Sequence, residues 1–182
     1  MNVIFLPQGD WLGLSFRLLL AMLVGAVIGL NRQRGGRPAG MRTFTLVAMG
    51  SALFVMVPIQ AEGDSSFAAI NALSRTVQGV AAGVGFLGAG LILQRAPKTK
   101  RSGRPRVSGL TTAATIWITA ALGAVIGCGL WQLGLIGAFF TLLTLSGFKR
   151  LQRIAWLRQS WERLIALEAK TLPPDAEEED DD

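Results

Sequence analysis

Long apolar segments alternate with short polar links along most of this chain. The apolar segments are residues 11–30, 41–59, 67–93, 109–129 and 130–148. Each is close to the ~20 residues with which an α-helix, rising about 1.5 Å per residue, crosses about 30 Å of hydrocarbon. A helix of a soluble core would show a polar face, but residues 77–93 carry no charge on any face. The pattern predicts an all-α, polytopic membrane protein with about five transmembrane helices.

Charges in the links predict how the spans are oriented. Basic residues follow the first, third and fifth spans, and those of the first and third links include Arg32, Arg34, Arg37, Arg42, Lys98, Lys100 and Arg101. The second link carries Glu62 and Asp64 instead, and the fourth has no charge. Cytoplasmic links of membrane proteins are rich in lysine and arginine. The N-terminus is therefore expected outside and the C-terminus in the cytoplasm.

Residues 149–182 follow a different pattern from the five spans of the predicted membrane domain, residues 1–148. In residues 149–172, arginines alternate with apolar positions at helical spacing, which predicts a basic amphipathic helix on the cytoplasmic leaflet. A helix packed on a soluble partner, or an extension of the fifth span, would show the same pattern. Residues 173–182 open with two prolines and are mostly acidic, so they are predicted to form a disordered tail. The side chains expected at anionic lipid headgroups are Lys98, Lys100, Arg101, Arg150 and Arg153.

Composition excludes several classes of function. Hydrophobic residues make up 51% of the chain and charged residues 16%, so the net charge of +6 reflects membrane orientation rather than nucleic-acid binding. The chain has no histidine and a single cysteine, Cys128. This composition rules out an internal disulfide and removes the commonest metal ligand and general base. With no nucleophile and base in a recognisable arrangement, we expect no metal, no cofactor and no enzymatic activity.

Glycines recur at short intervals inside the spans. Residues 83–90 contain Gly-x-Gly-x-x-Gly, the spacing of a dinucleotide-binding loop, but that loop needs a preceding strand and lies in water. In a membrane, small residues instead let helix backbones approach closely. The glycines predicted to pack helices together are Gly25, Gly29, Gly79, Gly83, Gly85, Gly88 and Gly90, with Gly123 and Gly127 at the same four-residue interval. Local helix breaks that line a binding site are the alternative.

Arg17 lies inside the first span. Residues 18–30 alone would rise only about 20 Å, so a membrane-crossing helix has to include Arg17. A guanidinium at the bilayer centre costs at least ~2.5 kcal/mol and normally faces a partner. No carboxylate occurs within any span. The expected counter-charge is an acid of a link, a helix carbonyl end, a lipid phosphate, an anionic ligand or a carboxylate of another protein, and the last would make Arg17 a reason to bind a membrane partner.

Other polar side chains inside the spans form two groups. Arg75 and Gln78 share one face of the third span near its outer end, although Arg75 could also extend to the outer headgroups. Thr112 and Thr115 share one face of the fourth span, where threonines commonly bond to their own helix backbone. A region that combined Arg17, Arg75 and Gln78 would suit a carrier of anions or small molecules.

Three stretches of the sequence, in order, resemble the membrane domain of MgtC/SapB proteins. They are RLLLAMLVGAVIGLNRQRGGRPAGMRTFTLVAMGSALF, GVGFLGAGLIL and SGLTTAATIWITAALGAVIG, within residues 16–148. The resemblance implies a multi-pass protein of the bacterial inner membrane with no established enzymatic activity. Members are associated with survival under magnesium limitation and inside macrophages. Their best-described role is restraint of the proton-translocating ATP synthase through its membrane rotor, and magnesium uptake is not implied.

The chain departs from the family pattern in three places. It reads Gly29-Leu30-Asn31-Arg32 where the family usually has Gly-Leu-Glu-Arg, and residues 71–73 lack the acidic residue common before the arginine of the third span. Residues 149–182 are too short for the folded cytoplasmic domain of longer members, so the chain resembles the short, SapB-like form. Asn31 and Arg42, both in the first stretch, join the candidate functional residues.

The sequence therefore favours a non-enzymatic regulatory membrane protein that acts by binding other membrane proteins. A carrier that uses Arg17, Arg75 and Gln78 is the alternative. The expected partners are the bilayer with its anionic lipids, a membrane subunit of the ATP synthase and a second copy of the chain, and no nucleic acid is expected.

Overall fold

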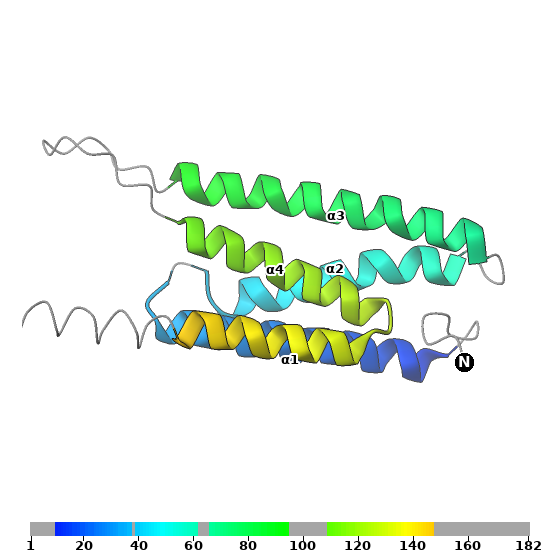
Figure 1. Ribbon diagram of the computed structural model, residues 1–182, viewed down its shortest axis with the longest axis horizontal. Coiled ribbons are helices and arrows are strands. Elements are labelled where there is room, and N and C mark those ends of the chain that lie inside the picture. The colour runs from blue at the N-terminus through cyan, green and yellow to red at the C-terminus, as the bar shows by residue number, and fades with distance from the viewer. Residues whose placement is uncertain (1–9, 38, 62–65, 95–108, 148–182) are drawn as a thin grey trace, which may run out of the picture. The chain divides into compact units, whose positions relative to one another are not determined.

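The computed structural model describes residues 10–37, 39–61, 66–94 and 109–147, and their regular structure is entirely α-helical. The helices are α1 (Trp11–Arg34), α2 (Met41–Ala61), α3 (Ser66–Gln94), α4 (Leu110–Gly127) and a fifth helix, Trp131–Gly147 (Figure 1). The first four are long and apolar enough to cross a membrane, and the fifth is slightly shorter. The predicted polytopic, all-α architecture is confirmed, while the orientation of the helices in the membrane stays a prediction.

The start of α1 is set by a side-chain cap. The Asp10 carboxylate accepts a hydrogen bond from the Gly13 backbone N–H at 3.0 Å. Such a bond satisfies one of the first four amides of a helix, which have no partner within the helix itself. Asp10 thus caps the first turn of α1.

A glycine turn ends α4 and starts the fifth helix. Gly129 has φ +86°, a left-handed conformation that glycine adopts without strain. Its N–H donates to the Ile126 carbonyl at 2.9 Å, and the Leu130 N–H donates to the Val125 carbonyl at 3.1 Å. This pair of bonds is the Schellman arrangement. It turns the chain back within three residues, so that the fifth helix can return alongside α4.

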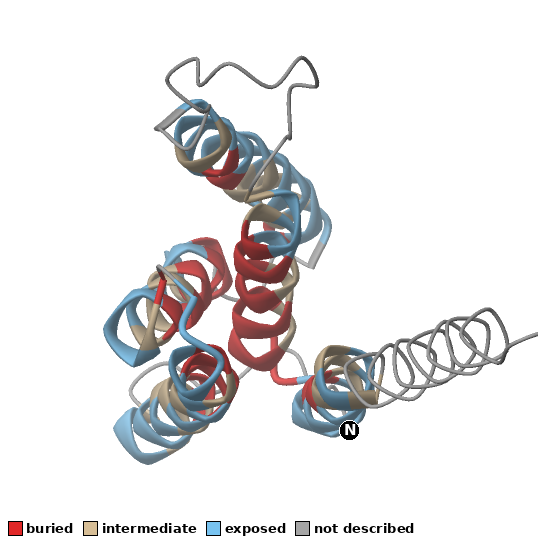
Figure 2. Cartoon of the chain, turned by 90° about the vertical axis from the view of Figure 1, so that its left-hand side faces the viewer, coloured by how far each residue is buried: buried red, intermediate tan, exposed pale blue. Residues whose placement is uncertain are grey.

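α4 is the central helix, because it contacts the fifth helix as well as α1, α2 and α3. Glycines bring its backbone against α2: a β-carbon built at Gly127 would lie 2.7 Å from the Ala52 carbonyl oxygen, and one at Gly123 would overlap the Ala48 backbone. Figure 2 shows buried residues gathered on the helix sides that face other helices. More than half of α4, 56% of its most apolar stretch, is buried inside the chain.

The fifth helix packs on α4 through glycines of its own. A β-carbon at Gly134 would lie 2.5 Å from Cγ1 of Ile126, and one at Gly137 would lie 2.6 Å from Cδ2 of Leu122. The chain divides into two compact units, Met1–Leu143 and Thr144–Asp182. The described part of the second unit is the end of the fifth helix, residues 144–147. The predicted amphipathic helix of residues 149–172 and the tail of residues 173–182 lie outside the described residues.

Candidate functional site: an apolar groove and two buried arginines

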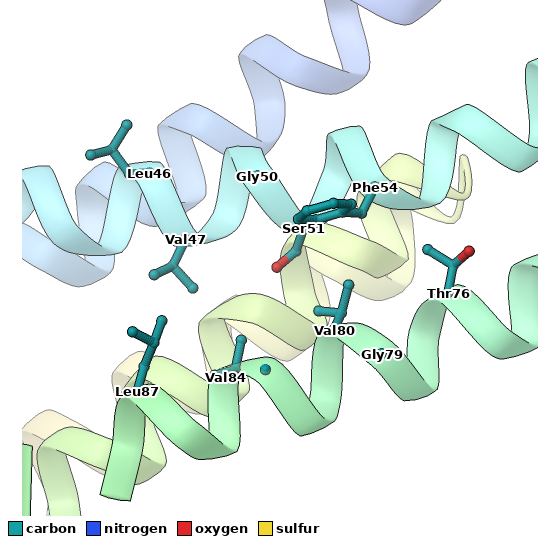
Figure 3. Close-up of a pocket in the computed structure, with 11 residues that line it drawn as sticks. Leu46, Val47, Gly50, Ser51, Phe54, Thr76, Gly79, Val80, Val84 and Leu87 are labelled. Carbon is teal, nitrogen blue, oxygen red and sulfur yellow. The ribbon is translucent and has the colours of Figure 1, made fainter. Parts of the chain in front are cut away.

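An apolar groove of about 630 Å³ runs between α2 and α3. Figure 3 shows Val47 and Ser51 of α2 directed towards α3, and Val80 and Leu87 of α3 directed towards α2, whereas Leu46 points away from α3 in this view. The α2 wall consists of Leu46, Val47, Gly50, Ser51 and Phe54, and the α3 wall consists of Thr76, Gly79, Val80, Gly83, Val84 and Leu87. None of the described residues that line it is charged. The two side-chain hydroxyl groups belong to Ser51 and Thr76, and that of Thr76 is already bound to the Ala72 carbonyl at 2.9 Å.

Glycines make this groove open. A β-carbon at Gly50, Gly79 or Gly83 would lie in open space, with no atom of another helix within 4 Å. These glycines therefore leave backbone exposed in a groove that has room for the side chains of another molecule. Pro58 interrupts the backbone hydrogen bonds of α2. Proline lacks the N–H that would bond to the Phe54 carbonyl one turn earlier.

The glycines predicted to pack helices together fall into two sets. Gly25 and Gly29 lie against α2: a β-carbon there would come within 2.6 Å of the Phe44 carbonyl oxygen and 2.5 Å of the Met41 Cα. Gly88 also faces a neighbour, because its β-carbon would lie 3.3 Å from that of Ala113 in α4. The prediction of close packing within the chain is wrong for Gly79, Gly83, Gly85 and Gly90, which have open space where a β-carbon would lie. The reason is that α3 contacts its neighbours along a narrow strip.

Arg17 is bound to the end of α4. The residue is 6% exposed, and its Nη1 donates a hydrogen bond to the Gly127 carbonyl at 3.0 Å. Gly127 is the last residue of α4, where unpaired carbonyls give the helix a partial negative charge. Of the counter-charges considered for Arg17, the structure provides the helix carbonyl end. Arg17 therefore has a structural role at the end of α4, and its contact with a carboxylate of another protein stays a prediction.

Cys128 lies next to this pair, in the link after α4. Burial raises the pKa of its thiol, and the nearby Arg17 guanidinium opposes that increase in part. The net effect is a thiol that stays protonated and unreactive at neutral pH. Cys128 is buried, which fits a packing role.

Arg32 is the residue that the sequence analysis missed. It was counted among the link bases, yet it is only 2% exposed, and its Nη2 donates to the Thr112 hydroxyl of α4 at 2.9 Å. Its Nε is buried without a hydrogen-bond partner among the described residues. The signal was present in the sequence: Gly25, Gly29 and Arg32 follow one another at helical spacing on a single face of α1.

The remaining candidates do not form one site. Thr112 and Thr115 are both buried, and the Thr115 hydroxyl donates to the Thr111 carbonyl of its own helix at 2.6 Å. Asn31 is half-buried near the end of α1, and Arg42 is exposed at the start of α2. Thr112 is joined to a charged residue, Arg32.

Arg75 and Gln78 lie apart from Arg17. Both are exposed on α3, and the Gln78 amide contacts the Ser74 hydroxyl at 3.4 Å. Helices α1 and α3 make no contact in the described structure. The carrier site that would combine Arg17, Arg75 and Gln78 is therefore wrong, because those residues belong to helices that are not neighbours.

Some expectations fall outside the described residues. These are the lipid-binding roles of Lys98, Lys100, Arg101, Arg150 and Arg153. Within the described residues, no group of three or more histidine, cysteine, aspartate or glutamate side chains is placed to hold a metal ion.

Comparison with known proteins places this helical bundle in a family. The profile of the MgtC family matches residues 18–154, which include all five helices except the first turns of α1. The chain belongs to the MgtC family. The match confirms the resemblance noted from the three motifs, and it covers the groove as well as Arg32.

Individual relatives support the assignment. Protein SrpB of Synechococcus elongatus is 99% identical over 182 residues, the whole of both chains. YhiD of Escherichia coli is 44% identical over 142 residues, which are 74% of this chain and 60% of YhiD. Protein MgtC of Brucella abortus is 43% identical over 110 residues, 60% of this chain and 40% of that protein. The chain thus matches only part of the length of these two longer relatives. No solved structure matches it.

Proposed function

We propose that this chain is a non-enzymatic regulatory protein of the bacterial inner membrane, and that it binds a transmembrane helix of another membrane protein in the α2–α3 groove. The observation that carries the proposal is the lining of the groove, which is apolar on both walls and interrupted by Gly50, Gly79 and Gly83. Small residues of this kind let a second helix approach closely enough for van der Waals contact.

The lining also argues for a helix rather than for a transported solute. A site for an anion or a hydrated ion needs polar or charged groups that replace its water, and this groove offers the hydroxyls of Ser51 and Thr76 alone among its side chains. A lipid tail would fit any apolar surface and would need no glycines. Glycines on both walls, with open space where a β-carbon would lie, favour a helix that presents its own side chains.

The family suggests which helix this is. Family resemblance implies restraint of the proton-translocating ATP synthase, so a helix of its membrane rotor is the proposed occupant. Binding there would hold a moving subunit by contact alone, with no chemistry supplied by this chain. A second copy of the chain is the competing occupant.

Two glycines of α3 give a matched pair for the test. Gly83 lines the groove and Gly85 does not, yet both are exposed and both have room for a side chain. Gly83→Leu should fill the groove and weaken partner binding by about tenfold, the effect of an overpacked contact. Gly85→Leu should bind like the wild type.

The measurements are recovery of co-purifying membrane subunits in a mild detergent and ATP-driven proton pumping in inverted vesicles. We expect the wild type and Gly85→Leu to retain the rotor subunit and slow pumping, and Gly83→Leu to do neither. Equal behaviour of the two variants would contradict the groove as the binding surface. Dimers that disappear only in Gly83→Leu, with no rotor subunit recovered, would identify the second copy as the occupant.

A further inference from the structure

A buried cation lies at the first turn of α4. Arg32 is 2% exposed and uses Nη2 to bind the Thr112 hydroxyl, while its Nε has no acceptor among the described residues. A buried donor without an acceptor is destabilising, and a donor on a charged group more so. The side chain thus has hydrogen-bonding capacity that the described polypeptide does not use.

The helix end that Arg32 reaches also has donors that lack a partner within the helix. α4 begins after Gly109, which has φ +105° and no side chain with which to cap the helix. The first amides of a helix have no partner within it, and those of Leu110, Thr111 and Thr112 hold these positions. The helix dipole adds partial positive charge at this end. A guanidinium and a helix N-terminus, both positive, therefore meet at Thr112.

The described residues supply no negative charge at this place. Their acidic side chains amount to Asp10, which caps the opposite end of α1. Thr112 provides an acceptor but carries no charge. A buried guanidinium beside a helix N-terminus, with donors that the helix itself does not use, is an arrangement that binds oxyanions in other proteins.

We propose that Arg32 and the N-terminus of α4 bind a phosphate group. Its several oxygens can accept from Nε and from the first amides of α4 at once, which a single-acceptor anion cannot do. The site lies at the end of α1 that leads into a basic link, predicted to face the cytoplasm. Both the headgroup of an anionic phospholipid and free inorganic phosphate occur there. The proposal is independent of the α2–α3 groove.

The test uses the full chain in a neutral detergent and follows its melting temperature. One arm adds inorganic phosphate against chloride at matched ionic strength. The other adds phosphatidylglycerol against diacylglycerol with the same acyl chains, so that the phosphate-bearing headgroup is the difference. Saturating ligand should raise the melting temperature by about 5–10 °C.

Arg42 provides the matched control, because it is exposed at the same end of the bundle, in the first turn of α2. Arg32→Gln should weaken binding by about tenfold or more, through loss of a charge-assisted hydrogen bond. Arg42→Gln should bind like the wild type. If Arg32→Gln fails to fold, Arg32→Lys keeps the charge, loses Nε and should also bind about tenfold more weakly.

Each outcome decides the proposal. A shift with inorganic phosphate alone supports free phosphate, a shift with phosphatidylglycerol alone supports a lipid headgroup, and shifts in both arms support both. The proposal is overturned if neither ligand stabilises the wild type. It is also overturned if the folded Arg32 variant keeps the full shift, or if Arg42→Gln weakens binding as much as the Arg32 variant does.

Discussion

Arg17 and Arg32 lie on the same buried face of α1 and bind opposite ends of α4. Arg17 donates to the carbonyl of Gly127 at the C-terminus of α4, and Arg32 donates to the hydroxyl of Thr112 at its N-terminus. The two arginines are about 22 Å apart along α1 at 1.5 Å per residue. They fix the antiparallel register of the two helices. They differ electrostatically, because Arg17 meets the negative end of the α4 dipole and Arg32 the positive end.

The first prediction concerns Arg17. Arg17→Leu should destabilise the protein by about 1–3 kcal/mol, because the Gly127 carbonyl loses a buried hydrogen-bond donor. The measurement is the melting temperature of the purified chain in detergent. Arg75→Leu is the control: Arg75 is exposed on α3, and its removal should change stability by less than about 0.5 kcal/mol. Equal melting temperatures for the two variants would contradict the capping role of Arg17.

The second prediction separates the two sets of glycines. Gly123→Ala should lower the melting temperature, by the equivalent of about 1–3 kcal/mol, because a β-carbon there overlaps the Ala48 backbone. Gly83→Ala should leave it unchanged or raise it, since alanine favours a helix over glycine by up to about 1 kcal/mol and the space is open. Destabilisation by Gly83→Ala would mean that α3 packs more tightly than described.

The third prediction concerns orientation in the membrane. In a chain whose Cys128 is replaced by alanine, Glu62→Cys should react with an impermeant thiol reagent in intact cells, and Ser102→Cys should react only after the membrane is permeabilised. The basis is the alternation of acidic and basic links. Labelling of Ser102→Cys in intact cells would show that the predicted orientation is wrong.

The fourth prediction concerns the native thiol. Because burial raises the pKa of Cys128, alkylation by iodoacetamide should be slow at pH 7 and accelerate as the pH rises, with the thiolate as the reacting form. Arg17→Leu removes a cation that lowers this pKa, so at a given pH the thiolate fraction should fall further. Mass spectrometry of the alkylated chain gives the rates, with Ser102→Cys as an internal reference. A faster reaction in folded Arg17→Leu would show that access, not ionisation, limits Cys128.

The helices could be predicted from the sequence because hydropathy and length determine them. Each predicted span lies within a few residues of a helix in the structure. The exact ends depended on local chemistry, such as the Asp10 cap and the turn at Gly129. The central position of α4 could not be predicted, since four-residue glycine spacing occurs equally in α3.

The site could be predicted only in part, because its contacts join residues far apart in the chain. Arg17 was recognised as buried, but its partner is 110 residues away. Arg32 was missed because the apolar run stops at Leu30 while the buried face of α1 continues. The glycine spacing predicted close helix contact at Gly79 and Gly83, whereas the position of α2 shows that they border an open groove.

The unequal lengths of α3 and α4 bear on the kind of bilayer that suits this protein. α4 has 18 residues and rises about 27 Å, slightly less than a typical hydrocarbon thickness, whereas α3 has 29 residues and rises about 43 Å. A long helix adapts to a thin bilayer by tilting, but a short one cannot lengthen, and α4 is held at both ends by α1. A bilayer of lipids with longer acyl chains would therefore have to become thinner around α4 while still covering the apolar residues of α3. The mismatch between helix length and hydrocarbon thickness therefore concerns α4, the most buried helix. Acyl-chain length is thus a variable to control whenever the protein is reconstituted.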